Sequence, residues 1–325
     1  MRTHWSSPYW GLFALFFLFL FYPNLGLAQK AEAPAPVHVG VYVNRVYDVS
    51  LRDNRFVTDF YIWFRWQDKE LKPFESFEIA NGHLDSRETI YQDVVEGFQY
   101  AVVRVTGTIT KYWDIRHFPL DNHIITIEIE DSQNEEFKFR YIADVENSTI
   151  SPDVQVPGWD IGSTQNQVLN HDYKTNYGDI SLPSGNASTY SRYIFSVNLL
   201  RPGYGYFKKL FLSLFLATLI SFLAFAIKPT DLDPRFGLGI GSIFAVAASQ
   251  YVVASSLPDS NIMTMADALH ILSITYIFLS LVESTISLKL ATGPKPELSQ
   301  KLDRYAMVIF ILSYLTFIWF IVFRF

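Results

Sequence analysis

The chain has 325 residues, no cysteine and a formal net charge of −6 at pH 7. The acidic balance and the lack of a basic stripe argue against nucleic acid as a partner. The missing cysteines exclude a disulfide framework. Half of the residues are hydrophobic and 17% are aromatic. These residues are unevenly distributed, so the chain divides into two parts with different patterns.

Residues 1–28 have the features of a secretory signal peptide. Arg2 and His4 precede the apolar run GLFALFFLFLFY, and small residues suit cleavage near Ala28. The alternative is an uncleaved anchor helix, for which the apolar run is short. Cleavage would leave the following segment outside the cytoplasm.

Residues 36–203 are expected to form an extracellular all-β domain. Short alternating or apolar runs rich in Val, Ile, Tyr, Phe and Thr are separated by Gly, Asn, Asp, Ser and Pro clusters. The strand-like runs are residues 37–49, 56–66, 99–110, 122–131, 136–143, 158–170 and 191–200. This spacing predicts an antiparallel, immunoglobulin-like sandwich.

Residues 204–325 carry four apolar runs and are expected to form a transmembrane domain. The predicted helices cover about 206–227, 235–256, 264–289 and 303–323. The third is long enough only if it continues past Glu283. Lysine and arginine occur in the loops 228–235 and 289–304 but not in 258–266. The positive-inside rule then places the sandwich outside a plasma membrane, the inner membrane in a bacterium.

The second predicted helix is unusually rich in glycine, alanine and serine. Small residues let helices pack closely, which is one explanation. The other is a helix that lines a pore, for which several copies of the chain would have to form a ring. At 3.6 residues per turn one stripe contains Gly237, Gly241, Phe244, Ala248, Tyr251 and Ser255. A ring of Phe244 side chains would make an apolar constriction that gates by dewetting.

Asp233 and Pro234 precede this helix. They predict an N-cap followed by proline at the first helical position. In a ring, Asp233 would also place several carboxylates at the pore mouth and favour cations. The neighbouring Arg235 would point either outward or into the pore.

The segment RHFPLDNH resembles the signature turn of the pentameric ligand-gated ion channels, the Cys-loop receptor superfamily, in its prokaryotic branch. Lys111 and Ile125 stand where animal receptors have the two cysteines. The resemblance covers about residues 36–325, with Trp66 at the family's core tryptophan and Ser213 where helix one usually has proline. Further matching segments are YIWFRWQD, LLRPGYGYF, SSLP at 255–258 and VESTIS around Glu283.

The resemblance implies a homopentamer with a pore lined by the second helix, and a junction that couples the sandwich to the pore. The implied coupling residues are Asp53 in the turn 51–54, Phe118, Pro119, Asp121, Arg201 and Pro258. Asp121 and Arg201 are expected to pair in a buried or half-buried position. The alternative is that Asp121 only stabilises its own turn.

The resemblance also implies a ligand site between subunits. Its candidates are Tyr173, Tyr177 and Tyr190, with Tyr61 from the neighbouring chain. Aromatic faces attract cations, which suggests an amine ligand. Packing is the alternative for any of these tyrosines, and Trp63 and Trp66 are expected to be core residues.

The acidic segment EIEDSQNEE offers Glu130, Asp131 and Glu135 as ligands for calcium as a modulator. A solvated acidic turn is the alternative. Glu283 is an ionisable residue within a predicted span. Together with His117, His123 and His270 it could sense pH.

The resulting hypothesis is a channel selective for monovalent cations and opened by an extracellular amine or proton. It needs no cofactor, and membrane lipid is an expected partner. The alternative is a membrane-anchored sensor or binding protein without a pore. An enzyme is not expected, because the sequence has no Gly-x-Ser-x-Gly, His-Glu-x-x-His or phosphate-loop motif.

Overall fold

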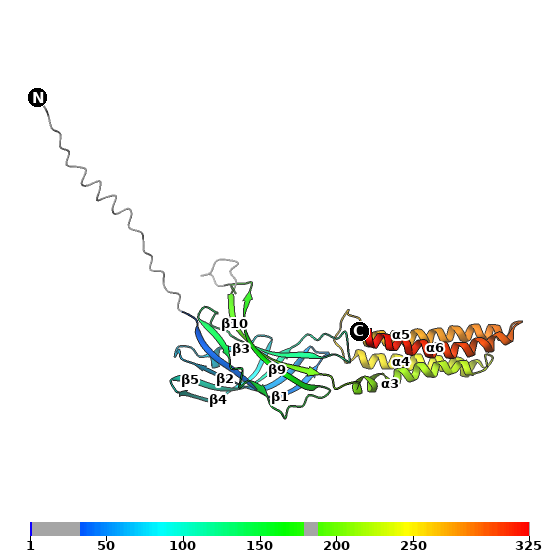
Figure 1. The fold of residues 1–325 in the computed structure, drawn as a ribbon, viewed down its shortest axis with the longest axis horizontal. Helices are drawn as coiled ribbons and strands as arrows, with labels where there is room; N and C mark the ends of the chain where they lie inside the picture. The colour runs from blue at the N-terminus through cyan, green and yellow to red at the C-terminus, as the bar shows by residue number, and fades with distance from the viewer. Residues whose placement is uncertain (2–32, 179–187, 325) are drawn as a thin grey trace.

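A β-sandwich and a bundle of four long helices lie end to end in the computed structural model of the protein (Figure 1). The structure describes the chain except for residues 2–32, 179–187 and 325. The predicted signal peptide therefore lies outside the described residues. The chain enters the helices from the last strand, and its C-terminus returns close to the sandwich (Figure 1).

The larger sheet has the strand order β4-β5-β2-β1-β7, with β8 also paired to β1. Its strands are β1 (Ala35–Ser50), β2 (Arg55–Trp66), β4 (Gly82–Val95), β5 (Phe98–Thr110), β7 (Phe139–Ala143) and β8 (Thr149–Ile150). Strand β1 runs parallel to β7 and β8. The prediction of a purely antiparallel sandwich is therefore wrong at this edge, where loops rather than hairpins connect the strands.

The smaller sheet has the order β3-β6-β10-β9 and is antiparallel. It consists of β3 (Phe77–Ile79), β6 (His123–Asp131), β10 (Ser188–Leu200) and β9 (Asp160–Tyr173), and the short helix α2 (Pro73–Ser76) precedes β3. Alternate residues point to the inside of the sandwich, since side chains along a strand alternate between faces. The buried stripe of β1 is Val37, Val39, Val41 and Val43.

Strand β4 has no counterpart among the strands expected from the sequence. It lies at the edge of the larger sheet, and nearly all of its residues are exposed. Its sequence therefore lacks the apolar alternation of a half-buried strand. The turn to β5 uses Glu96 and Gly97, both with positive φ, as a two-residue hairpin requires.

The four spanning helices are α3 (Gly205–Phe222, continued by the 3-10 turn η1, Leu223–Ala226), α4 (Leu232–Ala254), α5 (Met265–Ala291) and α6 (Pro296–Arg324). All four are long and apolar enough to cross a membrane. Helix α6 begins seven residues before the predicted start at 303, because its polar first turns do not register as an apolar run.

The start of α4 differs from its prediction. The N-cap is Asp231, which makes no side-chain capping bond, and Asp233 lies in the first turn. At α5 the cap is complete, because Thr264 and Asp267 form a reciprocal capping box. Three spans begin with an acidic residue in the first turn, where the helix dipole favours negative charge: Asp233 in α4, Asp267 in α5 and Glu297 in α6.

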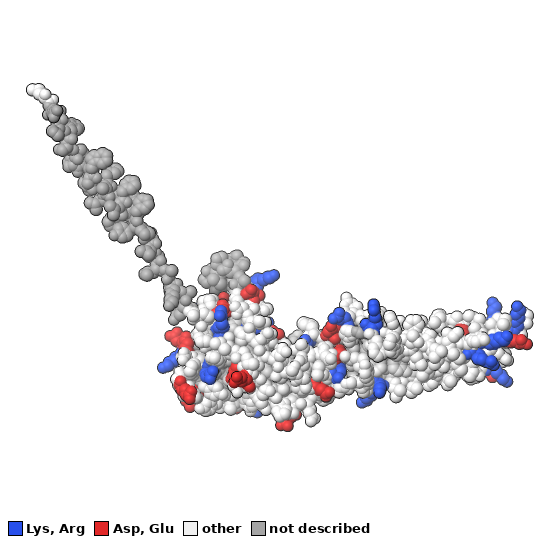
Figure 2. All heavy atoms as spheres, in the orientation of Figure 1, with Lys and Arg blue, Asp and Glu red and all other residues white. Residues whose placement is uncertain are grey.

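Charged side chains gather over the sandwich, at its junction with the helices and at the opposite end of the bundle (Figure 2). The long middle part of the bundle shows almost none on this face (Figure 2). This distribution fits a belt of lipid around the helices.

Candidate functional site

One face of α4 is open. The seven predicted pore-lining residues all lie on it and are exposed in the single chain: Asp233, Gly237, Gly241, Phe244, Ala248, Tyr251 and Ser255. Phe244 is 71% exposed and Tyr251 is 77% exposed. A Cβ added at Gly237 or Gly241 would meet nothing within 4 Å. This face is therefore free to meet other chains, lipid or water.

The opposite face of α4 packs against its own chain. Its buried residues are Arg235, Gly239, Ser242, Val246 and Val253. Arg235 precedes Gly237 by two positions, about 200° around the helix. Gly239 allows close packing, because a Cβ there would lie 2.5 Å from the side chain of Leu281 on α5. The small residues of α4 therefore fit both explanations given for them. Gly239 allows close helix packing, while Gly237 and Gly241 lie on the open face that could line a pore.

Arg235 is fully buried and binds two carboxylates from different helices. Its Nη2 donates to Asp303 of α6 at 2.6 Å and to Glu283 of α5 at 3.3 Å. Its Nη1 donates to the carbonyl of Ile227 at 2.8 Å. The expectation that Arg235 points outward or into the pore is wrong, because its partners lie inside the bundle. Asp233 remains exposed at the open face.

Asp121 and Arg201 form the ion pair expected from the sequence. Nε of Arg201 donates to Oδ1 of Asp121 at 3.3 Å, and both side chains are buried. The guanidinium carbon lies 3.6 Å from the centroid of the Trp159 ring and 5.0 Å from that of Tyr206. Burial lowers the pKa of Arg201, and the carboxylate of Asp121 opposes this effect. The carboxylate and the two aromatic rings therefore hold the charged guanidinium of Arg201 inside the junction between the sandwich and the helices.

His123 is the second partner of Asp121. Its Nε2 lies 2.5 Å from Oδ2 of the carboxylate. The imidazole is buried with its ring edge-on to Trp113 and Trp159, at centroid distances of 5.0 and 5.2 Å. Asp121 therefore does more than stabilise its own turn, because it connects β6 to Arg201 at the end of β10.

Besides the contact of Arg201 with Tyr206, three further contacts connect the sandwich to the helices. Nη1 of Arg52, in the turn 51–54, donates to the carbonyl of Ser255 at 3.4 Å. The backbone N–H of Met265 donates to the carbonyl of Arg116 at 2.8 Å. The rings of Phe118 and Tyr206 meet edge-on at 6.2 Å. Of these residues, the sequence analysis named Phe118 for coupling and Ser255 for the pore, and it implicated the turn 51–54 that contains Arg52.

The other predicted coupling residues have simpler surroundings. Asp53 is exposed and, within the described residues, bonds only to Ser50 in its own turn. Pro119 is buried, and Pro258 is half-buried at the start of the α4–α5 loop. Residues missed at the sequence level, Trp159 above all, give no local signal because their partners are distant in the chain.

Three of the four tyrosines proposed for the ligand site lie together. The ring of Tyr173 lies 5.7 Å from those of both Tyr177 and Tyr190. Residues 179–187 of the same hairpin lie outside the described residues. Tyr61 is in β2 of the other sheet, with the guanidinium of Arg104 6.0 Å from its ring centroid. It is therefore separate from the three within one chain.

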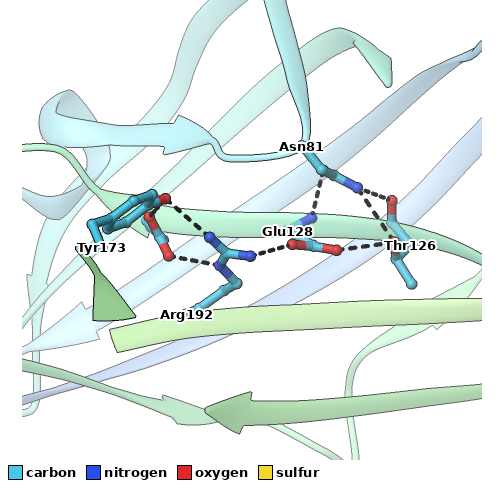
Figure 3. A network of polar contacts seen from close by, with 6 residues as sticks. Asn81, Thr126, Glu128, Tyr173 and Arg192 are labelled. Carbon is cyan, nitrogen blue, oxygen red and sulfur yellow. Dashed lines mark hydrogen bonds and ion pairs between the residues drawn. The ribbon is translucent and has the colours of Figure 1, made fainter. Parts of the chain in front are cut away.

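A charged network lies beside these tyrosines (Figure 3). Arg192 of β10 donates to Glu128 and Glu130 of β6 at 2.6 Å each. The hydroxyl of Tyr173 donates to Glu130 at 2.7 Å. Burial, followed by this bond, raises the pKa of Tyr173 to about 12. Burial and the charges of Glu130 and Asp131 raise the pKa of the neighbouring Glu78. The surroundings of the tyrosines are therefore acidic.

The proposed calcium ligands are engaged with protein groups. Glu130 binds Arg192 and Tyr173, while Asp131 accepts bonds from the backbone N–H groups of Gln133 and Asn134 at 3.0 and 2.7 Å. Glu135 is half-buried nearby. Within the described residues, no three His, Cys, Asp or Glu side chains of one chain come together as a metal cluster. Calcium modulation stays a prediction.

The two tryptophans of β2 differ. Trp66 is buried and donates to the carbonyl of Leu71 at 3.0 Å, as expected of a core residue. Trp63 is only half-buried, so the prediction of a core position is wrong for it. It donates to Asp144 at 3.1 Å and lines a cavity of about 300 Å³ together with His38, Arg65, Tyr100, Asp144 and Asn147. Trp63 and Tyr61 share one face of β2.

The residues expected to sense pH are dispersed. His117 is exposed, His123 is in the junction and His270 is buried in the bundle. Nδ1 of His270 lies 2.8 Å from the carbonyl of Ala266, and its Nε2 lies 3.2 Å from Oγ of Ser249. Glu283 belongs to the ion-pair cluster of Arg235. These groups do not form one site.

A two-sheet sandwich followed by four apolar helices, with its last strand and signature hairpin packed against the helices, defines the fold of the pentameric ligand-gated channels. The chain is 22% identical to the human gamma-aminobutyric acid receptor subunit rho-3 over 77% of its length. It is 19% identical to a proton-gated ion channel of Gloeobacter violaceus over 86% of its length. These homologues confirm the resemblance to the Cys-loop receptor superfamily.

The alignments cover 57% of the receptor subunit and 80% of the proton-gated channel. No protein-family model matches the chain. At the level of the family the homologues are channels rather than enzymes. Together with the four apolar helices, they indicate an integral membrane protein.

Proposed function

We propose that the protein is a homopentameric ligand-gated channel for monovalent cations. The observation that carries the proposal is the open face of α4. This face combines exposed glycines with an exposed phenylalanine and tyrosine, while the opposite face is packed on the chain's own helices. Five such faces around an axis would line a pore, and Phe244 would form its narrow apolar ring.

Cation selectivity rests on the two charges at the start of α4. Arg235 is bound by Glu283 and Asp303 and is fully buried, so it contributes no exposed positive charge at the pore mouth. Asp233 is exposed in the first turn. A ring of these carboxylates would attract cations and repel anions.

The agonist in this proposal is a small amine. Tyr173, Tyr177 and Tyr190 offer ring faces, and Glu78 and Glu130 supply negative charge beside them. Tyr61 and the cavity at Trp63 lie on the other sheet, where a neighbouring subunit would present them to this cluster. A proton as agonist and calcium as modulator are the alternatives that the same experiment separates.

Current recorded from the full chain in liposomes tests the function. The bath would be changed in turn to a panel of amines, to lower pH and to added calcium. Current evoked by an amine supports the proposal, and current evoked only by acid assigns the proton as agonist. Reversal potentials that follow the sodium gradient rather than the chloride gradient support cation selectivity. Silence in every condition, with reconstituted protein shown to be folded, favours a sensor without a pore.

The sandwich is proposed to face outside the cytoplasm across a bacterial inner membrane. The lysine-bearing turns support this orientation, because they lie at the end of the bundle opposite the sandwich (Figures 1 and 2). Protease added to intact spheroplasts would cleave the sandwich in this orientation. Protection of the sandwich would reverse the assignment.

A further inference from the structure

A cavity of about 420 Å³ opens where α5 turns into α6, at the end of the bundle remote from the sandwich. We name it the turn cavity. It is lined by Ile286, Lys289, Leu290, Gly293, Pro294 and Lys295. None of these residues belongs to the α4 face, the junction or the tyrosine cluster.

The lining of the turn cavity combines two chemistries. Ile286 and Leu290 lie one helical turn apart on α5 and form an apolar wall with Pro294. Lys289 and Lys295 are exposed at the cavity. Neither lysine has an ion-pair partner in the part of the chain that the structure describes. The cavity therefore offers two unneutralised cations beside a hydrocarbon surface.

The surroundings of the turn cavity add positive charge. Lys301 and Arg304 are exposed three positions apart on the first turns of α6. Between residues 286 and 302 the only acidic residue is Glu297, and Asp303 is buried against Arg235. Lysine and arginine side chains accordingly gather at this end of the molecule (Figure 2).

The position of the turn cavity favours a phospholipid headgroup over a small soluble anion. It lies at the end of two apolar spans, at the depth where phospholipid headgroups meet hydrocarbon. An ammonium group suits a phosphate, and basic pockets between spanning helices bind anionic headgroups. A small water-soluble anion would make no favourable contact with the apolar wall, whereas the first methylenes of an acyl chain would pack against it.

We propose that the turn cavity binds the headgroup of an anionic phospholipid from the leaflet remote from the sandwich. Lys289 and Lys295 bind the phosphate, and Ile286 and Leu290 contact the start of an acyl chain. Lys301 and Arg304 raise the local concentration of anionic lipid without entering the cavity. This binding site is independent of channel activity.

Native mass spectrometry of the full chain in detergent tests the proposal. The protein is mixed with phosphatidylglycerol or with phosphatidylcholine of the same acyl chains, and retained lipid is counted. We expect the wild type to retain phosphatidylglycerol preferentially. Lys289→Gln/Lys295→Gln should lower this preference by on the order of tenfold. The matched control is Lys208→Gln/Lys209→Gln, which removes two exposed charges at the sandwich end of α3 and should keep the preference.

Three results would overturn the proposal. First, the wild type could retain both lipids equally. Second, the two glutamine double variants could lose the preference for phosphatidylglycerol to the same extent. Third, inorganic phosphate could displace phosphatidylglycerol when both are present at equal concentration. Lys289→Arg/Lys295→Arg keeps both charges and should keep the preference. This arginine variant serves as the folded comparison if the glutamine variant fails to fold. If the arginine variant stays folded and loses the preference for phosphatidylglycerol, that result also contradicts the proposal.

Discussion

Arg201 is held by a carboxylate on one side and by aromatic rings on the others. Its Nη1 also donates to the carbonyl of Gly158 at 3.2 Å, so the guanidinium joins β10, the hairpin of Asp121 and the segment before β9. Lysine could not replace it, because only the planar guanidinium stacks on a ring while donating in several directions. The charge at this position therefore fixes how the end of β10 enters α3.

We expect Arg201→Lys and Asp121→Asn to abolish opening while the protein still assembles. The structure adds a cost in stability, because removing one partner of a buried pair typically costs about 3–5 kcal/mol. Agonist-evoked current per reconstituted protein would be measured beside the melting temperature. A matched control is Arg45→Lys, whose pair with Asp59 is largely exposed on the arginine side. Normal gating in both junction variants would contradict the coupling role.

Contacts at the junction and in the bundle could be predicted only where the resemblance supplied both partners, because the partners lie far apart in the sequence. Asp121 and Arg201 could be expected as a pair because the resemblance supplied both positions. Trp159 could not, since nothing near it in sequence indicates a cation 42 positions later. Arg235 was left with two orientations because Asp303, its nearest partner, lies 68 positions away.

Strands β3 and β6 place two acids directly opposite each other, with Glu78 paired in register to Glu130. Like charges at such a position destabilise a sheet. The pKa of Glu78 is raised by burial and by its acidic neighbours. The folded state therefore binds the proton of Glu78 more tightly than the unfolded state does.

We predict that Glu78→Gln stabilises the sandwich at pH 7 by less than about 1 kcal/mol, since the group is partly solvated. A raised folded pKa gives stability below the unfolded value near 4.5 that is lost as pH rises through the folded value. The difference between wild type and variant should therefore vanish below that unfolded value. Melting temperatures at pH 4 and pH 7 check this. An equal gain at both values would exclude the charge explanation.

Helix α4 exposes Phe244 on a face that the single chain leaves open. Its removal should cost little packing, because the ring is 71% exposed. We predict that Phe244→Ala raises current in the absence of agonist, since a smaller ring of side chains dewets less readily. Phe278→Ala on α5 is the matched control, with a ring that is 59% exposed. A basal current that rises equally in both variants would remove Phe244 from the gate.

The cluster of Arg235, Glu283 and Asp303 joins α4, α5 and α6. We predict that Arg235→Gln lowers thermal stability more than Glu283→Gln does. Loss of the arginine leaves two buried carboxylates facing each other, whereas loss of Glu283 leaves the 2.6 Å pair with Asp303 intact. Melting in detergent ranks the two variants, and the reverse order would show that the carboxylates are stabilised by other groups.

Most long strands with a buried stripe were predictable, whereas the exposed edge strand β4 was not. The apolar alternation of β1, β2, β5, β6 and β10 gives each a core stripe that the sequence displays. Strand β4 packs by its backbone at a sheet edge, so its side chains carry no such pattern. The beginning of α6 was missed for the same reason, since its first turns are polar.

At the scale of the whole molecule, the single chain leaves two surfaces open. The open face of α4 and the cavity at Trp63 both remain uncovered. We predict that native mass spectrometry of the purified chain gives a mass five times that of the protomer. The resemblance implies five copies, and a closed ring covers both surfaces in every copy. A monomer in mild detergent that keeps its fold would contradict this stoichiometry.

The turn from α5 to α6 consists of Thr292–Lys295 alone. Nothing of the described chain thus projects beyond the bundle at this end except helix termini and short turns (Figure 1). A protein that approaches from that side of the membrane would meet, of the described chain, only these short turns and helix ends.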